Sequence, residues 1–409
     1  MASALRGIRV IETATAAAGP MTGRLLGDWG ADVIHVEHPL HGDMGRSQGS
    51  LATVRHRGGR FMESDIDHRF ENHNCNKRGM TLDLSQELGQ DILYRMLKRA
   101  DVFLVNFRPR ELKKFKLEYE TLSRLNPSLI FADVTGYGRE GPDQDLPGYD
   151  FNAFWAKSGL LHVLQTPEMS PPPTPNANGD RTAAIALACG ILVALFEREK
   201  NGIGQEVDVS LFGTGIFFNA TDVGGSLVTG KDRQNINRED VINALQNSYK
   251  TKDGRWFRLA LPQPDRYWSR FCHAIEREDI EKDPRFASFE PRIDNHLALF
   301  HILEEVFMSR PLAEWKVRLT EAQLPWAAVQ TLPEVISDPQ ARANGYFVAC
   351  DHPVHGSIEL VANPVKLSKT PASVRLPAPQ FGQHTEEILL EYDYTWQDIN
   401  SFKKQGVIA

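Results

Sequence analysis

The alternation of short apolar segments with helix-like segments in the first 135 residues constrains the fold most strongly. Residues 8–12 are typical of a short strand, small residues follow up to Gly19, a helix is predicted from Pro20 to about Gly27, and residues 32–37 are typical of a second strand. Strand, turn, helix and strand make a βαβ unit with a right-handed crossover and parallel strands. The sequence therefore predicts an α/β fold with a Rossmann-like parallel sheet.

The same alternation continues along the chain and then changes in character. Further strands are expected at about 80–84, 102–107, 129–134 and 206–211, with helices at about 87–99, 119–126, 151–155 and 182–195. Residues 42–71 are polar, glycine-rich and aperiodic, which is typical of a long surface loop.

Residues 226–330 predict a separate, smaller α+β domain. Two strand-like segments flank Asp253-Gly254, the strongest short hairpin signal in the chain, and amphipathic helices are expected at about 265–273, 296–308 and 312–322. We therefore predict a large domain over 1–225, a small domain over 226–330, and a return segment over 331–409 that completes the large domain and ends with a helix at about 386–392.

Composition excludes several classes of protein. A net charge of −7 over 409 residues argues against a general nucleic-acid-binding protein. The longest apolar stretch, 183–196, falls short of the ~18 residues of a membrane span, and the first residues lack a secretory core, so a cytoplasmic protein is expected. Four widely spaced cysteines without ligand-type spacing predict neither a disulfide framework nor a metal site.

Polar segments follow several of the predicted strands. The carboxyl ends of parallel strands meet at one edge of a sheet, where open α/β sheets bind ligands. Each segment alone also fits ordinary turn chemistry or a solvated charge, but their recurrence predicts a ligand site. Lys77 precedes its predicted strand, so a loop would have to present it. The strand-end segments are the turn after Glu12, His38, Asn106-Phe107-Arg108 and Thr135-Gly136-Tyr137-Gly138.

Asp180 stands directly after Gly179 and before a long apolar run. Backbone N–H groups and the helix dipole converge at such a position, which predicts an ionised carboxylate able to act as a nucleophile. Aspartate is also among the preferred N-cap residues, so this stretch alone favours an ordinary helix cap over a catalytic role.

Taken together and in order, a series of motifs resembles the class III CoA-transferases, the CaiB/BaiF family, from Leu5 to about Leu390. The motifs are Leu5-Arg6-Gly7-Ile8-Arg9-Val10-Ile11-Glu12, Ala18-Gly19-Pro20, Leu26-Gly27-Asp28-Trp29-Gly30-Ala31-Asp32-Val33-Ile34, Asn76-Lys77-Arg78, Asn106-Phe107-Arg108-Pro109, Thr135-Gly136-Tyr137-Gly138, Pro147-Gly148-Tyr149-Asp150, Gly179-Asp180, Gly202-Ile203-Gly204-Gln205 and Gly382-Gln383-His384-Thr385.

This resemblance implies a reaction and a set of site residues. Asp180 falls on the family's nucleophile, which would move CoA from an acyl-CoA donor to a free carboxylic acid acceptor through a mixed anhydride and an aspartyl-CoA thioester. It also implies an interlocked homodimer, for which linkers at about 200–230 and 325–350 have suitable lengths. The positions that it implies for binding coenzyme A, the co-substrate, are Ala17, Ala18, His38, Asn74, Cys75, Asn76, Lys77, Asn106, Phe107, Arg108, Lys114, Thr135, Gly136, Tyr137 and Gly138.

Departures from the family pattern narrow the substrate. His38 stands where relatives often have arginine, and Ala17 where formyl-CoA transferases have a glutamine. Formyl and oxalyl substrates are disfavoured, because that glutamine and the glycine-rich lid of the family's small domain are both missing. The run 137–151 is similar to the branch that includes aryl-lactate and other 2-hydroxy-acid transferases, and Tyr149 is a candidate contact for the acid. Two alternatives remain: an α-methylacyl-CoA racemase, although Tyr149-Asp150 replaces the His-Asp pair of those enzymes, and an acyl-CoA-binding protein without activity.

Overall fold

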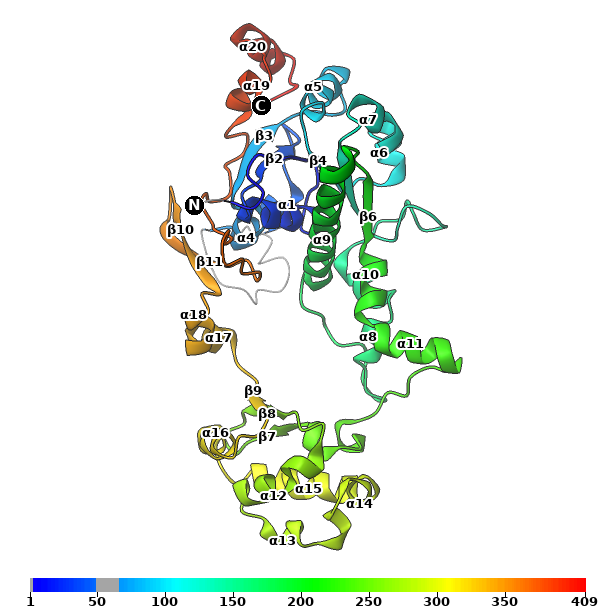
Figure 1. Cartoon of the computed structure of the whole chain (residues 1–409), viewed down its shortest axis with the longest axis vertical. Coiled ribbons are helices and arrows are strands. Elements are labelled where there is room, and N and C mark those ends of the chain that lie inside the picture. The colour runs from blue at the N-terminus through cyan, green and yellow to red at the C-terminus, as the bar shows by residue number, and fades with distance from the viewer. Residues whose placement is uncertain (1–2, 49–65) are drawn as a thin grey trace. The chain divides into compact units, whose positions relative to one another are not determined.

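The computed structural model describes residues 3–48 and 66–409 (Figure 1), and the chain forms two compact units. The large unit comprises Met1–His162, Pro173–Lys231 and Gln340–Ala409. The small unit comprises Val163–Pro172 and Asp232–Pro339. The chain leaves the large unit after Lys231, because helix α11 (Ala220–Thr229) runs through the Gly224-Gly225 pair at which the sequence suggests a boundary.

A six-stranded sheet forms the centre of the large unit, in the order β3-β2-β1-β4-β5-β6, and all its strand pairs are parallel. The order reverses between β1 and β4, as in the Rossmann fold, and ligands bind beside such a switch point. The strands are β1 (Arg9–Glu12), β2 (Asp32–Glu37), β3 (Lys77–Thr81), β4 (Val102–Val105), β5 (Ile130–Thr135) and β6 (Glu206–Ser210).

Alternate residues of each strand enter two separate hydrophobic cores. Val10 and Ile130 pack beneath helices α1 (Ala18–Asp28) and α9 (Asn178–Asn201) on one face. Ile11 and Phe131 face the opposite core. The helices that contribute to this second core are α5 (Glu87–Leu97), α6 (Pro109–Phe115), α7 (Tyr119–Leu125), α19 (Thr385–Glu391) and α20 (Trp396–Lys404).

Smaller elements complete the large unit. The antiparallel pair β10–β11 lies in the return segment and packs Cys350 and Leu360 against Cys75. Residues 150–156 form a π-helical segment that precedes α9 in the chain. The remaining elements are α2 (Met44–Gln48), α4 (His68–Asn74), α8 (Leu160–Val163), α10 (Leu211–Phe218), α18 (Pro339–Ala343), β10 (Phe347–His352) and β11 (Gly356–Val361).

The small unit has a three-stranded antiparallel sheet beside helices. The predicted hairpin is present, since β7 (Ser248–Lys250) pairs with β8 (Trp256–Leu259). Its core gathers aromatic rings, among them Phe257 and Phe307, whose centroids lie 4.8 Å apart. The other elements are β9 (Trp326–Ala328), α12 (Pro264–Ala274), α13 (Glu278–Glu281), α14 (Phe289–Asp294), α15 (His296–Phe307), α16 (Leu312–Glu321) and α17 (Leu332–Ser337).

Three expectations about local structure are wrong. Strand β3 begins at Lys77 rather than Met80, so Lys77 belongs to the sheet and not to a loop. The expected loop 42–71 contains α2 and part of α4, while residues 49–65 lie outside the described residues. Helix α20 follows the helix predicted to be last. Polar composition concealed α2, α4, α20 and the start of β3, because tertiary contacts stabilise them. The segment 200–230, suggested as a linker, contains the strand predicted at 206–211, observed as β6, followed by α10 and α11.

Helix α9 is long and apolar enough, by length and composition alone, to cross a membrane. In the structure it packs against α1, β5 and β6, and its last turn carries Arg198 and Lys200. Its apolar character is therefore accounted for, in part, by its place over the sheet.

Candidate active site

Asp180 lies in the first turn of α9 and does not cap that helix. The N-cap position is Ala177, which has a left-handed φ of 61°. The cap comes instead from Asp150, whose buried carboxylate accepts hydrogen bonds from the backbone N–H groups of Ala177 (3.1 Å), Gly179 (2.6 Å) and Asp180 (3.3 Å). A carboxylate from another segment thus satisfies the helix start, and the side chain of Asp180 is left available for chemistry.

Gly179 is required at this helix start by close packing. A Cβ atom at position 179 would lie 2.2 Å from the ring of Phe154, a buried residue of the π-helical segment. Only glycine permits this approach. Close packing therefore accounts for Gly179, and the candidate nucleophile Asp180 follows it directly in the chain.

Two cavities of the large unit meet at Asp180. The main cavity has a volume of about 600 Å³ and reaches the ends of β4 and β5, where Asn106 and Thr135 line it. The side cavity has a volume of about 400 Å³ and is lined by Arg69 and Phe151, among others. The residues that line both cavities are Ala16, Ala17, Met44, Tyr149 and Asp180.

The electrostatic surroundings of Asp180 correct one expectation. The helix start was expected to keep this carboxylate ionised. Burial, and in second place the neighbouring Asp150 carboxylate, instead raise the pKa of Asp180 to about 7. The Arg181 and Arg69 guanidinium groups oppose this increase without overcoming it. Near neutral pH the residue therefore exchanges between a neutral acid and a poorly solvated carboxylate.

The main cavity brings together many of the residues that the sequence suggested for coenzyme A. Asn106 also fixes the neighbouring turn, because its side chain exchanges hydrogen bonds with the backbone of Thr15. Arg108 pairs with Glu111 at 2.5 Å on the cavity wall. The suggested residues that line this cavity are Ala17, Ala18, Asn106, Phe107, Arg108, Lys114, Thr135, Gly136 and Tyr149.

The remaining suggested residues are not among the described residues that line either cavity. Lys77 is buried, and its Nζ atom lies 2.7 Å from Glu12 Oε1 and 2.8 Å from Asn74 Oδ1, so in this arrangement it offers no ammonium group to a phosphate. Asn74, Cys75 and Asn76 are also buried. His38 lies beside Asp83, with 3.6 Å between Nε2 and Oδ1. Tyr137 and Gly138 belong to the turn after β5, outside both linings.

Three residues of this site escaped the sequence analysis. Asp150 follows the candidate Tyr149, and its capping role depends on contacts with residues 27 to 30 positions away. Met44 and Arg69 border the cavities but fall in the stretch expected to be a surface loop. The Tyr149-Asp150 pair was the one local signal that pointed to this part of the site.

Comparisons with known proteins identify the family of this chain. The family model for CoA-transferase family III matches residues 5–385. The chain is 34% identical to the (R)-2-hydroxy-4-methylpentanoate CoA-transferase of Clostridioides difficile over 99% of both chains. It is 34% identical to the cinnamoyl-CoA:phenyllactate CoA-transferase of Clostridium sporogenes, over 97% of this chain and 95% of that one.

A solved structure of a CaiB/BaiF family protein from Brucella suis shares the fold. The TM-score is 0.83 at 28% identity, over 96% of this chain and 100% of that one. The family match covers most of the sequence, and the relatives align with both units and not with the sheet alone. The protein is therefore an enzyme that belongs to CoA-transferase family III.

Proposed function

We propose that this enzyme transfers CoA from an acyl-CoA thioester to a free carboxylic acid, with Asp180 as the nucleophile. The observation that carries the proposal is the position of Asp180 where the two cavities meet, with its side chain freed from capping by Asp150. The main cavity would take the pantetheine and thioester end of the donor, and the side cavity would take the acyl group.

The proposed reaction passes through activated acyl groups. The Asp180 carboxylate attacks the donor thioester carbonyl and displaces CoA thiolate, which gives a mixed anhydride. The thiolate then attacks the aspartyl carbonyl, releases the donor acid and leaves an aspartyl-CoA thioester. The acceptor carboxylate attacks this thioester, and the released thiolate attacks the acceptor carbonyl of the second anhydride. The products are a new acyl-CoA and free Asp180.

The start of α1 is the best placed source of oxyanion stabilisation. The backbone N–H groups of Gly179 and Asp180 are not free for this role, because they already donate hydrogen bonds to Asp150. Ala17 and Ala18, at the N-terminus of α1, line the main cavity. Backbone donors of this kind are worth about 3 kcal/mol each in the transition state of acyl transfer.

The acid is proposed to carry an apolar or aromatic side chain, as in 2-hydroxy acids of that type. The side cavity has Met44, Tyr149 and Phe151 in its wall, and the two relatives described above are named for a hydroxy-methylpentanoate and for phenyllactate. The test is a panel of acids offered with one acyl-CoA donor, with a hydroxylamine trap to capture the enzyme-bound acyl group. Exchange with small dicarboxylates alone would contradict the assignment of the acid, and no exchange or trapped adduct would contradict CoA transfer.

Replacing Lys114 by methionine is expected to raise the KM for the acyl-CoA about five- to tenfold, with kcat nearly unchanged. Lys114 lines the main cavity and would neutralise a phosphate of CoA, an interaction of about 1–1.4 kcal/mol at an exposed site. Steady-state kinetics at two salt concentrations measures this, and the difference should shrink at high salt. Lys113→Met is the matched control, since Lys113 is exposed and not among the described residues of the cavity wall. Equal effects of both changes would contradict the prediction.

The rate of formation of the first acyl-enzyme is expected to rise with pH and to level off above about pH 7. Burial first, and then Asp150, raises the pKa of Asp180 to about 7, and only its ionised form is a nucleophile. Single-turnover trapping of the acyl-enzyme between pH 5 and 9 measures this increase of the rate with pH. Asp150→Asn removes the like charge and should move the midpoint to lower pH. A pH-independent rate, or a midpoint unmoved by this change, would contradict the assignment.

A racemase would need an acid/base pair beside the α-carbon of the substrate. Among the described residues that line the two cavities there is no histidine, and Tyr149 is 56% exposed. Deuterium incorporation at the α-carbon of a branched acyl-CoA, without exchange of CoA, would favour that alternative.

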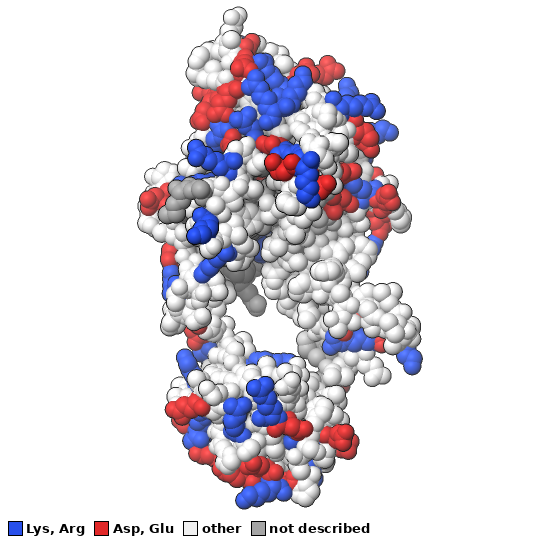
Figure 2. Space-filling model, viewed as in Figure 1, with Lys and Arg blue, Asp and Glu red and all other residues white. Residues whose placement is uncertain are grey.

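The protein is also proposed to form a homodimer. Apolar side chains that are 55% to 88% exposed gather on three successive helices of the large unit, more than a single soluble chain ordinarily leaves uncovered. In Figure 2 the surface around α9 and α10 carries few charged side chains. A light-scattering mass of 46.0 kDa, that of one chain, would contradict the proposal. The exposed residues are Ile185, Val193 and Phe196 on α9, Phe217 and Phe218 on α10, and Leu227 and Val228 on α11.

A further inference from the structure

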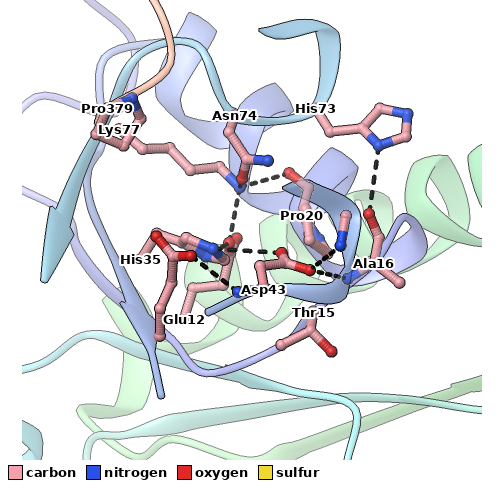
Figure 3. Close-up of polar contacts among 12 residues, drawn as sticks. Glu12, Thr15, Ala16, Pro20, His35, Asp43, His73, Asn74, Lys77 and Pro379 are labelled. Atoms are coloured by element: carbon pink, nitrogen blue, oxygen red, sulfur yellow. Dashed lines mark hydrogen bonds and ion pairs between the residues drawn. The ribbon is translucent and has the colours of Figure 1, made fainter. Parts of the chain in front are cut away.

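A cluster of four charged side chains lies buried behind the cavity wall (Figure 3). Glu12, His35, Asp43 and Lys77 are each at most 1% exposed. Glu12 Oε1 lies 2.6 Å from His35 Nδ1 and 2.7 Å from Lys77 Nζ, and His35 Nε2 lies 3.3 Å from Asp43 Oδ2. This buried cluster connects the last residue of β1, an interior residue of β2 and the first residue of β3 with the segment that precedes α2.

The cluster reaches the active site through Asp43. Asp43 Oδ1 accepts hydrogen bonds from the backbone N–H groups of Ala16 (2.8 Å) and Gly45 (2.6 Å). Ala16 lines both cavities beside Asp180. At the other end of the cluster, Lys77 Nζ donates to the backbone oxygen of Pro20 (2.8 Å), in the first turn of α1. The buried cluster therefore contacts both the turn that contains Ala16, in the cavity wall, and helix α1, which follows that turn.

Ala16 has a backbone conformation that needs outside support. Its φ is 74°, in the left-handed region that costs a non-glycine residue about 1–2 kcal/mol. Such a conformation persists when surrounding contacts determine it. Asp43 holds the Ala16 N–H group, and His73 Nδ1 lies 3.3 Å from the Ala16 carbonyl oxygen. These two contacts fix both sides of the strained residue.

The charges of the buried cluster support a fixed arrangement. Burial alone would lower the pKa of His35, but the contacts with Asp43 and Glu12 raise it to about 9, so the ring is a cation at neutral pH. The His35 contact lowers the pKa of Asp43 against the effect of burial. Burial lowers the pKa of Lys77, and the adjacent Glu12 side chain opposes that decrease. Removal of one member leaves a buried charge uncompensated.

We propose that Asp43 is a positioning residue for CoA transfer, anchored by His35, which holds Ala16 in its left-handed conformation at the wall of the Asp180 cavity. Asp43 lines neither cavity among the described residues and acts through the turn. This turn leads into the start of α1, so its displacement would move the proposed oxyanion donors away from the reacting carbonyl. The kinetic part of this inference rests on the proposed function, whereas the structural part does not.

The first test compares Asp43→Ala with Asp43→Asn. The alanine removes the acceptor for the Ala16 N–H group, and the asparagine keeps an oxygen there. Asp43→Ala is expected to lower kcat about 100-fold, the effect of a misplacement of about 1 Å, with the KM for acyl-CoA changed less than threefold. Asp43→Asn should lose less than tenfold. Asp91→Ala, an exposed aspartate on α5, is the control. Equal losses in the two Asp43 variants would overturn the proposal.

The second test adds Ala16→Gly to Asp43→Ala. Glycine adopts a positive φ without strain, so the kcat of the double variant should be at least about fivefold higher than that of Asp43→Ala alone. Hydrogen exchange of the peptide that contains Ala16 is a readout independent of activity, and its protection should fall in Asp43→Ala and persist in Asp43→Asn. If Asp43→Ala does not fold, His35→Gln takes its place with the same rescue. Unchanged protection in a folded variant would overturn the proposal, even if the enzyme proved not to transfer CoA.

Discussion

Replacing Asp180 by asparagine is expected to lower kcat for CoA transfer at least about 10⁴-fold, because the proposed covalent route has no other nucleophile in this position. Binding of acyl-CoA should persist, since the other residues of the main cavity remain. Intact-protein mass spectrometry after incubation with acyl-CoA and hydroxylamine should show a modified Asp180 in the wild type and none in the variant. Glu140→Gln, an exposed carboxylate near the site, is the control.

The same variant carries a stability prediction whose sign follows from the pKa of Asp180. The pKa is raised from 3.8 to about 7 by burial and by Asp150, so the folded protein holds this proton more tightly than the unfolded chain. The free energy of unfolding therefore falls as the pH rises from 3.8 to about 7, and the loss is complete once Asp180 is ionised in the folded protein as well. Asp180→Asn should raise the Tm above pH 7, and the gain should disappear below pH 3.8. An adduct on the variant, or a lower Tm at pH 8, would contradict these assignments.

Replacing Asp150 by alanine is expected to lower kcat about 100-fold and to destabilise the large unit by about 1–3 kcal/mol. The carboxylate accepts hydrogen bonds from three backbone N–H groups at the start of α9, and its loss leaves buried donors without a partner. The first turn of α9 carries Asp180, so fraying there moves the nucleophile. Urea unfolding and steady-state kinetics measure the two effects.

Asp150→Asn is the matched comparison for this change. Its side-chain oxygen keeps an acceptor for the helix start, so we expect at least half of the lost stability to return. Removal of the negative charge also lowers the pKa of Asp180. If alanine and asparagine proved equally stable and equally active, Asp150 would not be the cap on which the position of Asp180 depends.

The sequence alone predicted most of the sheet and pointed to Asp180 as the candidate nucleophile. Apolar periodicity predicted β2 at residues 32–37, where it is observed, and placed the hairpin of the small unit at Asp253-Gly254. These features depend on residues close together in the chain, so a local pattern is enough. Strand-end reasoning also placed Asn106 and Thr135 at one edge of the sheet, and both line the main cavity.

Only the tertiary structure decided the roles of the charged residues. Lys77 was expected to bind coenzyme A from a loop, but its ammonium group is buried against Glu12, which is 65 positions away. Asp180 looked like a helix cap until Asp150, 30 positions earlier, proved to occupy that place. The sequence does not show which partner a charged side chain contacts or how deeply it is buried. These two features determine the pKa of the side chain and whether it contacts a ligand. The pattern therefore pointed to the candidate site, and the contacts between distant segments determined which side chains line it.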